Sequence, residues 1–503
     1  MKKILALMMI MSLILVSCGG GENTSTTSQN AEDKVEVAQD LRVTLNGITN
    51  TMDVNIANYT NTSTIMYQVL SNLIYFDETF SMKPEVLTSW DQLDENTYEL
   101  VINPDYMFHN GEPVTVEDVQ YSILRLADIP QTASSVENIK DITIVDDKTL
   151  KMVTINPENN TMRGMANIVV VPKKLVEEQG DKYWEHPVGS GPFEFVSFVP
   201  GQEVVIKKWD DYPFEKAKLD SITFKNIEDA TSLYIALETG ETDFINKVQY
   251  LDQPRAEEHE DIKIQKVETV NTGFIAMNAS KAPFDNELIR RAVAFATDKE
   301  SMALLSGDAV VIDSMVPHFV EGYHSADTVP VYDVEKAKAL LKEAGYENLS
   351  ITCSAYSSDT ARIELLQADL KKVGIEMNIE ILEFGVFLDK VINQDYELLF
   401  GSWGNTNGDV ASMLDCYTES SWGESNIAFY LDPEMDRLHK LAVETLDHDE
   451  KIEALKDIQE LAGQACSMVP TTSGLTCYGM KKNLHGVGFI PSGILDFSKA
   501  YLE

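Results

Sequence analysis

The chain has 503 residues, 44% of them apolar and 24% charged, which is long enough for two or three domains with buried cores. Its 81 Asp and Glu residues against 40 Lys and Arg residues give a formal net charge of −41, and a surface of that sign repels phosphate backbones and anionic headgroups. The composition therefore argues against nucleic acid as a partner. Acidity of this size is otherwise typical of a solvated surface and identifies no ligand.

The N-terminal segment has the layout of a secretory signal. Lys2 and Lys3 precede an uncharged run from Ile4 to Val16, which is too short to span a bilayer comfortably. The run ends in Leu-Val-Ser-Cys18, which resembles the bacterial lipobox, a motif whose cysteine thiol accepts diacylglycerol. We therefore expect residues 1–17 to be a signal peptide and Cys18 to be the lipidated first residue of the mature chain. The alternative is an ordinary cleaved signal in which Cys18 is incidental.

Residues 18–39 are rich in Gly, Ser, Thr, Asn, Gln and charge. A segment of this composition cannot bury a core, so it is predicted to be a flexible tether. No later segment has the uncharged length of a transmembrane helix, and the remaining residues are predicted to form a soluble body.

Strand and helix patterns alternate along this body. Two-residue alternation predicts a strand over 98–102 and a hairpin over 193–208. Thr115 begins a capping box, and Asp432-Pro433 marks the start of a later helix. Between them, a helix over 335–344 is preceded by an aspartate and ended by a glycine.

The best-defined unit lies between 349 and 403. Strand patterns cover 349–356, 375–381 and 396–403, and a helix over 360–373 connects the first two strands. This is a βαβ unit, so the sheet that contains it is at least partly parallel. The sequence therefore predicts a mixed α/β fold.

Motifs that would indicate catalysis are missing from the sequence. There is no G-x-S-x-G, H-E-x-x-H, Walker loop or G-x-G-x-x-G motif. His439 and His448 do not share a helix face and are expected at the surface. Paired carboxylates carry no weight in so acidic a chain. We therefore expect no enzymatic activity, no cofactor and no metal.

Four cysteines follow Cys18, and their spacing matches no zinc module. Cys353 alternates with apolar residues as the inward face of a strand does, and it is expected to be a buried thiol. The sequence leaves open whether Cys466 and Cys477 form a disulfide.

Four groups of motifs occur in order along the chain. They are Leu87-Thr88-Ser89-Trp90 with Phe108 to Val119, Pro187 to Phe195 with Ala236 to Asp243, Pro283-Phe284-Asp285 with Arg290-Arg291, and Ala337 to Tyr346. Together they resemble the extracellular solute-binding proteins of family 5, the receptors of peptide and nickel ABC importers, over residues 41–502. Members with these motifs bind dipeptides, longer peptides, glutathione, nickel chelates and some sugars, so the motifs do not specify a ligand.

The resemblance implies a two-lobed α/β fold of the periplasmic-binding-protein type, with mixed sheets flanked by helices. Carried onto this chain, lobe one comprises 40–74, 189–274 and 478–503, with an extra domain at 75–188, and lobe two comprises 275–477. Two chain crossings near these boundaries would form a hinge. Closure on the ligand would then be the signal that the permease detects.

A ligand site is expected beyond the carboxyl ends of strands, where open α/β sheets bind ligands. Two predicted strands end at Tyr356 and Trp403, and the loop that follows, which includes Asn407 and Gly408, presents Asp409. Dipeptide-binding members of the family have a similar Trp and Gly-Asp stretch here. The resemblance thus implies that Asp409 binds the ligand ammonium, that Trp403 lines the pocket and that Tyr356 matches a neighbouring aromatic.

Plainer explanations remain for these residues: Asp409 would cap a turn, and Trp403 and Tyr356 would be core residues. Dipeptide binders also have an Arg that holds the ligand carboxylate two residues before the aromatic at 356, where this chain has Ser354. Arg362 is close in sequence but is expected at the surface of its helix. This departure favours longer peptides or an amine-bearing solute over a strict dipeptide.

The expected function is that of a substrate-binding lipoprotein of an ABC importer. It would capture a peptide, in particular an oligopeptide, and deliver it to the membrane permease. The protein would be an extracytoplasmic monomer held to the cell membrane by the lipid on Cys18. One alternative is capture of nickel, a metal chelate or another amine-bearing solute by a receptor of the same class. A secreted hydrolase is disfavoured by the missing catalytic motifs.

Overall fold

The computed structural model describes residues 37–503, except for 58, 158–160, 167, 347, 357–359 and 405–407. The expected signal peptide, Cys18, most of the expected tether and Asn407 lie outside the described residues. In the described part of the chain, no helix combines the length and the apolar composition that crossing a bilayer would require.

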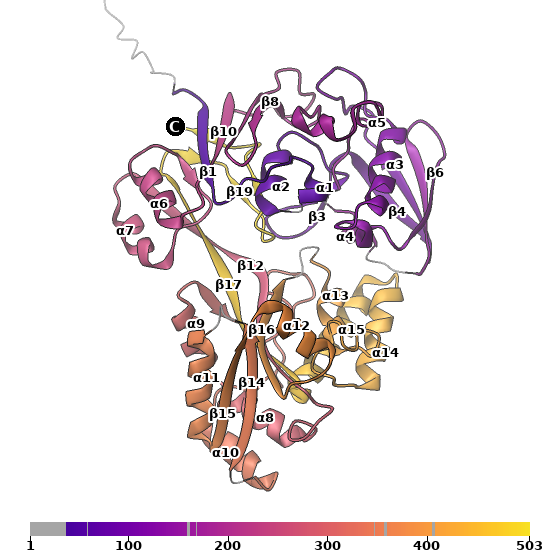
Figure 1. The fold of residues 1–503 in the computed structure, drawn as a ribbon. Coiled ribbons are helices and arrows are strands. Elements are labelled where there is room, and N and C mark those ends of the chain that lie inside the picture. Colours follow the sequence, from indigo (N-terminus) through magenta and orange to yellow (C-terminus); the bar gives the residue numbers. More distant parts are fainter. Residues whose placement is uncertain are drawn as a thin grey trace, which may run out of the picture. The chain divides into compact units, whose positions relative to one another are not determined.

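A mixed sheet of eleven strands runs through the described residues (Figure 1). Its order is β15-β14-β16-β12-β17-β11-β1-β10-β9-β8, and the short β13 pairs with β17 outside this order. The strands are β1 Asp40–Leu45, β8 Phe193–Val199, β9 Glu203–Lys208, β10 Ser221–Asn226, β11 Phe244–Ile245, β12 Ile262–Met277, β13 Ala309–Val311, β14 Leu349–Tyr356, β15 Ile375–Leu382, β16 Leu398–Gly404 and β17 Met468–Lys481. The predicted hairpin over 193–208 is confirmed as β8 and β9.

The long strands β12 and β17 form an antiparallel ribbon in the middle of this sheet (Figure 1). Their pairing runs from Ile262 opposite Lys481 to Ala276 opposite Met468, with irregular register on both sides of Thr272. β17 also pairs with β11, whereas β12 pairs with β16 along its last seven residues. The ribbon therefore links the strands around β1 to the strands around β14.

The predicted βαβ unit is confirmed, with small shifts at its ends. β14 and β15 pair in parallel, and helix α11 (Thr360–Lys372) connects them. The third strand, β16, begins at Leu398, two residues later than predicted, and pairs in parallel with β14. Cys353 on β14 is fully buried, as its alternation with apolar residues predicted. The four described cysteines are all buried and free, so Cys466 and Cys477 are not bridged.

A separate antiparallel sheet has the order β4-β5-β7-β6. Its strands are β4 Leu87–Asp94, β5 Thr97–Ile102, β6 Ile139–Ile144 and β7 Thr149–Thr154. Helix α3 (Val116–Leu124) buries Val119 and Ile123 in the same apolar cluster as Leu100 of β5. The predicted capping box is confirmed, since Thr115 Oγ1 accepts from the Asp118 amide and Asp118 Oδ2 accepts from the Thr115 amide.

Capped helices flank the main sheet, as the sequence indicated. Asp333 accepts from Lys336 N at 2.9 Å at the start of one helix, and Asp432 accepts from Glu434 N at 2.9 Å at the start of another. These two helices are α10 Val334–Glu343 and α14 Pro433–Glu444. The other α-helices besides α3 and α11 are α1 Val54–Ala57, α2 Thr60–Met66, α4 Thr161–Gly164, α5 Lys173–Gln179, α6 Ala230–Glu238, α7 Gln253–Glu258, α8 Glu287–Ala296, α9 Lys299–Ser306, α12 Phe384–Ile392, α13 Val410–Leu414 and α15 His448–Ala465. Short strands pair as β2 Ile74–Phe76 with β3 Met82–Pro84, β18 Leu484–His485 with β21 Tyr501–Leu502, and β19 Gly488–Phe489 with β20 Leu495–Asp496.

Two residues expected at the surface are instead packed against other elements. His439 Nε2 lies 2.8 Å from Asp415 Oδ1 and 3.0 Å from the carbonyl oxygen of Ala411, because α14 packs against α13. Arg362 lies over the Phe400 ring and donates to Thr472 Oγ1 at 3.2 Å. These expectations were wrong because helix periodicity does not reveal which polar face a neighbouring element covers. His448 is exposed, as predicted.

The hairpin formed by β2 and β3 packs into an apolar cluster made mainly by residues after 270. Phe76 and Phe80 of this hairpin belong to the same cluster as Val410, Leu414 and residues of α14 and α15. The Phe80 ring lies 5.9 Å from that of Phe319, edge to face. The hairpin thereby brings the neighbourhood of α4 close to Gly408, which lies shortly before α13.

Candidate functional site

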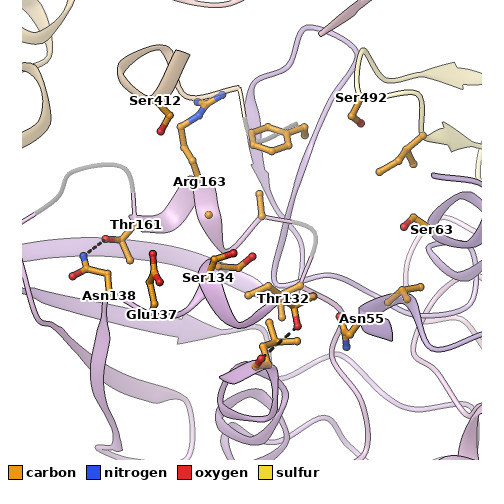
Figure 2. A pocket seen from close by; sticks show the side chains of 18 of the residues that line it. Asn55, Ser63, Thr132, Ser134, Glu137, Asn138, Thr161, Arg163, Ser412 and Ser492 are labelled. Atoms are coloured by element: carbon orange, nitrogen blue, oxygen red, sulfur yellow. Dashed lines mark hydrogen bonds between the residues drawn. The ribbon is translucent and has the colours of Figure 1, made fainter. Parts of the chain in front are cut away.

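A cavity of about 1020 Å³ lies where these segments meet (Figure 2). Its walls come from α1 and α2, the chain between 132 and 139, α4, the end of β16, α13 and the loop at 492–494. A volume of this size is at the upper end of the range for small-molecule pockets. It would hold a solute of several residues or an equivalent mass.

Hydroxyl and amide groups dominate the lining of this cavity. The labelled side chains in Figure 2 include Asn55, Ser63, Thr132, Ser134, Asn138, Thr161, Ser412 and Ser492. Ser492 Oγ is buried and has no hydrogen-bond partner among the described residues. Among the described lining residues, the charged side chains are Glu137 and Arg163. The hydroxyl and amide side chains both donate and accept hydrogen bonds, as the amides of a peptide require.

Asp409 lies beside this cavity as the N-cap of α13. It is 1% exposed, and its Oδ2 accepts from the amide and the hydroxyl of Ser412, each at 2.8 Å. Ser412 itself lines the cavity, one turn along the helix. Capping is thus one role of Asp409, and it leaves the carboxylate charge in place at the cavity border.

Two basic side chains that the sequence analysis missed interact electrostatically with Asp409. Arg163, on α4, has its guanidinium carbon 5.0 Å from the Phe76 ring centroid and donates to the Phe80 carbonyl at 3.3 Å. Burial lowers the pKa of Arg163, and the carboxylates of Asp409 and Glu321 oppose that shift. Burial likewise lowers the pKa of Lys451 on α15, and Asp409 again opposes it. The carboxylate therefore already has cationic neighbours from two separate helices.

Gly408 allows this close approach of chain segments. Its φ is +64°, a left-handed conformation that favours glycine. A Cβ added here would lie 2.4 Å from Phe80 Cε1 and 2.7 Å from Arg163 Nη2. Gly408 thus lies close to the β2–β3 hairpin and to Arg163.

Trp403 and Tyr356 pack against the apolar cluster that contains Val410. The Trp403 ring lies 4.4 Å from Phe274, and the Tyr356 ring lies 5.7 Å from Phe387. Both side chains are partly buried, and neither is among the described residues that line the 1020 Å³ cavity, although Gly404 beside Trp403 is.

The position where dipeptide binders have an arginine holds a buried serine in this structure. Ser354 is 1% exposed and donates to Glu380 Oε2 at 2.8 Å. It therefore offers no charge to a ligand carboxylate. In the described part of the chain, no three His, Cys, Asp or Glu side chains lie together as they would to hold a metal ion.

Comparison with known proteins identifies the family. The model of the bacterial extracellular solute-binding proteins, family 5 Middle, matches residues 81–425. The glutathione-binding protein GsiB of Pectobacterium atrosepticum is 24% identical over 497 residues, which cover 95% of this chain and 96% of that protein.

Solved structures share the fold. HbpA2 from Haemophilus parasuis has a TM-score of 0.86 at 22% identity, covering 92% of this chain and 100% of its own. DppA from Helicobacter pylori, in complex with the peptide STSA, has a TM-score of 0.70 at 23% identity, covering 92% of this chain and 98% of its own. The predicted two-lobed α/β fold of periplasmic binding proteins is thus confirmed. The chain belongs to the bacterial extracellular solute-binding proteins of family 5.

Proposed function

We propose that this protein is the substrate-binding lipoprotein of an ABC importer and that it captures an oligopeptide for the membrane permease. The observation that carries the proposal is the 1020 Å³ cavity, whose lining of hydroxyl and amide groups matches the donors and acceptors of a peptide backbone. GsiB is named for binding glutathione, which is a tripeptide, and DppA was solved with a tetrapeptide. Lipid on Cys18 would hold the receptor at the outer face of the membrane.

The peptide would be bound by closure of two lobes. Lobe one would comprise 40–74, 189–274 and 478–503, with the extra domain at 75–188, and lobe two would comprise 275–477. Supporting this division, β12 and β17 form a two-stranded ribbon whose register is irregular around Thr272. Irregular pairing weakens the ladder locally, so bending would concentrate there.

The ends of the peptide would be recognised by opposite charges. Asp409 would bind the free amino group, and Arg163 would replace the arginine that is missing at Ser354 and bind a carboxylate. Arg163 has the planar donor geometry that suits a carboxylate. The ammonium of a zwitterionic solute would face Asp409 and its carboxylate would face Arg163, in place of the attraction between these two side chains.

The decisive experiment is calorimetric titration of the purified protein with one peptide library in four chemical forms. The forms are free, N-acetylated, C-amidated and doubly blocked. A retained ligand found by native mass spectrometry would define the library, and its unchanged mass after incubation would exclude hydrolysis. We expect acetylation and amidation each to weaken binding by more than about tenfold, as loss of a charge-assisted hydrogen bond does. Equal affinity for all four forms would contradict recognition of the peptide ends.

A further inference from the structure

A second cavity, of about 560 Å³, adjoins the first, and Tyr67, Phe76 and Ile494 line both. Its lining includes the aromatic side chains Tyr75, Tyr106, Tyr212 and Phe214. The Tyr106 and Phe214 rings are 4.6 Å apart, and those of Tyr212 and Phe214 are 5.4 Å apart. These aromatic residues come from three separate chain segments, so the tertiary fold alone assembles this aromatic wall.

The charges around this aromatic wall are mainly negative. The carboxylates in the lining are Asp77, Glu78, Glu85, Glu215 and Asp496, against one ammonium, Lys499. Asp77 is already engaged, because it accepts from Thr79 and Ser81 and pairs with Lys83.

Glu85 differs from Asp77 in its partners. Its Oε2 accepts from the amide of Asn72 at 2.9 Å and from Asn72 Nδ2 at 3.1 Å, and within the described residues it forms no ion pair. Burial, with the nearby charge of Asp496 adding to it, raises the pKa of Glu85 to about 7, and the Asn72 hydrogen bonds oppose that shift. The charge of Glu85 also raises the pKa of four neighbouring tyrosines, Tyr67, Tyr75, Tyr106 and Tyr212.

Asn72 supplies a second and independent sign of a missing partner. The residue is 4% exposed and lines the cavity, and its Oδ1 is buried with no hydrogen-bond partner among the described residues. A buried acceptor without a donor is costly. Because Asn72 Nδ2 donates to Glu85, the unused acceptor and the carboxylate lie next to each other. A ligand group with several N–H donors and a positive charge would satisfy both.

We propose that this cavity receives an organic cation, namely the alkylammonium or guanidinium end of a basic side chain of the captured solute. The tyrosine and phenylalanine rings stabilise the cation by cation–π contact, Glu85 supplies the opposite charge, and Asn72 Oδ1 accepts one of its N–H groups. That the cation belongs to a captured solute rests on the proposed function. The chemistry of the cavity itself does not depend on that source.

The test compares peptides that differ only in charge. Ala-Lys-Ala is titrated against Ala-norleucine-Ala, with the basic residue moved through all three positions, and Ala-Arg-Ala against Ala-citrulline-Ala. The wild-type protein should prefer the cationic member at one position by about tenfold or more. Glu85→Gln should reduce that preference to about one, because glutamine still accepts from the Asn72 amide but carries no charge. Phe214→Leu, which removes an aromatic face, should weaken the preference as well.

Glu343→Gln is the matched control. Glu343 is an exposed residue in the last turn of α10, so the substitution changes the net charge equally while leaving the cavity intact. This variant should keep the full preference for the cation. Equal loss in both variants would mean that only the overall acidity attracts cations and would overturn the proposal, as would equal affinity of the wild-type protein for lysine and norleucine peptides.

A second arm separates this proposal from the proposed function. Saturation-transfer NMR with n-butylammonium and with 1-butanol tests the cavity without any peptide. If no peptide binds but n-butylammonium gives a signal that Glu85→Gln abolishes, the peptide function fails and the cation site stands, with a free small amine as its ligand. If peptides bind without charge preference and n-butylammonium gives no signal, the cation site fails and the peptide function stands.

Discussion

Replacing Asp409 by Asn separates the charge of this residue from its capping role. Asparagine is as good an N-cap as aspartate, so Asp409→Asn should still accept from the Ser412 amide and leave α13 intact. Asp409→Ala should in addition cost about 1 kcal/mol of folding stability through the lost cap. A difference in stability between the two variants therefore measures the cap, whereas a shared effect on binding measures the charge.

The expected loss of binding follows from the burial of Asp409. The residue is 1% exposed, and breaking a buried ion pair typically costs about 3 to 5 kcal/mol. Arg163 and Lys451 already interact with this carboxylate, so a ligand ammonium would partly replace existing attraction. We therefore expect Asp409→Asn to weaken binding of the free peptide by about 3 kcal/mol, the lower end of this range, which is roughly a hundredfold in affinity.

Calorimetric titration of the wild-type protein and Asp409→Asn with free and N-acetylated forms of one peptide gives a double-mutant cycle. In the wild-type protein acetylation should weaken binding, and in Asp409→Asn it should make little further difference, because the partner of the amino group is already gone. Scanning calorimetry of both variants checks that the fold persists. If Asp409→Asn binds the free peptide as tightly as the wild type does, or if acetylation weakens both proteins equally, Asp409 is a capping residue and the amino group is bound elsewhere.

Four further predictions concern other parts of the chain. Burial raises the pKa of Glu85 from 4.5 to about 7, so the folded protein holds the carboxyl proton more tightly than the unfolded chain does. The free energy of unfolding therefore falls as pH rises between these two values. In urea unfolding, Glu85→Gln should raise the free energy of unfolding by at most roughly 3 kcal/mol at pH 8 and by little at pH 4. Burial lowers the pKa of Lys299 to about 8, so Lys299→Met should raise the free energy of unfolding by roughly 1 to 3 kcal/mol at pH 7, a gain that shrinks as pH rises toward 10.5. Gly408→Ala should lower the free energy of unfolding by roughly 2 to 4 kcal/mol, because of the positive φ at this position and the clash of the new Cβ with Phe80. Gly385→Ala is the control and should not be destabilising, since a Cβ there meets nothing within 4 Å. Cys18→Ala should strand the uncleaved precursor, which intact-mass measurement of the purified protein would detect, and an unmodified mature form of the wild type cleaved elsewhere would contradict lipidation.

Local sequence patterns were enough to predict the elements that local forces determine. The capping box at Thr115, the caps at Asp333 and Asp432 and the βαβ unit around Cys353 depend on neighbours within a few residues or on simple periodicity.

The tertiary structure alone decided what surrounds Gly408 and Asp409. Arg163 lies 246 positions before Asp409, in a short helix without a sequence signature, and only the docking of the β2–β3 hairpin brings the two charges together. Whether Trp403 and Tyr356 face solvent or the core also depends on which element covers each strand end. A strand pattern specifies the side of the sheet on which a residue lies, but the partner on that side comes from distant segments, whose packing no local pattern encodes.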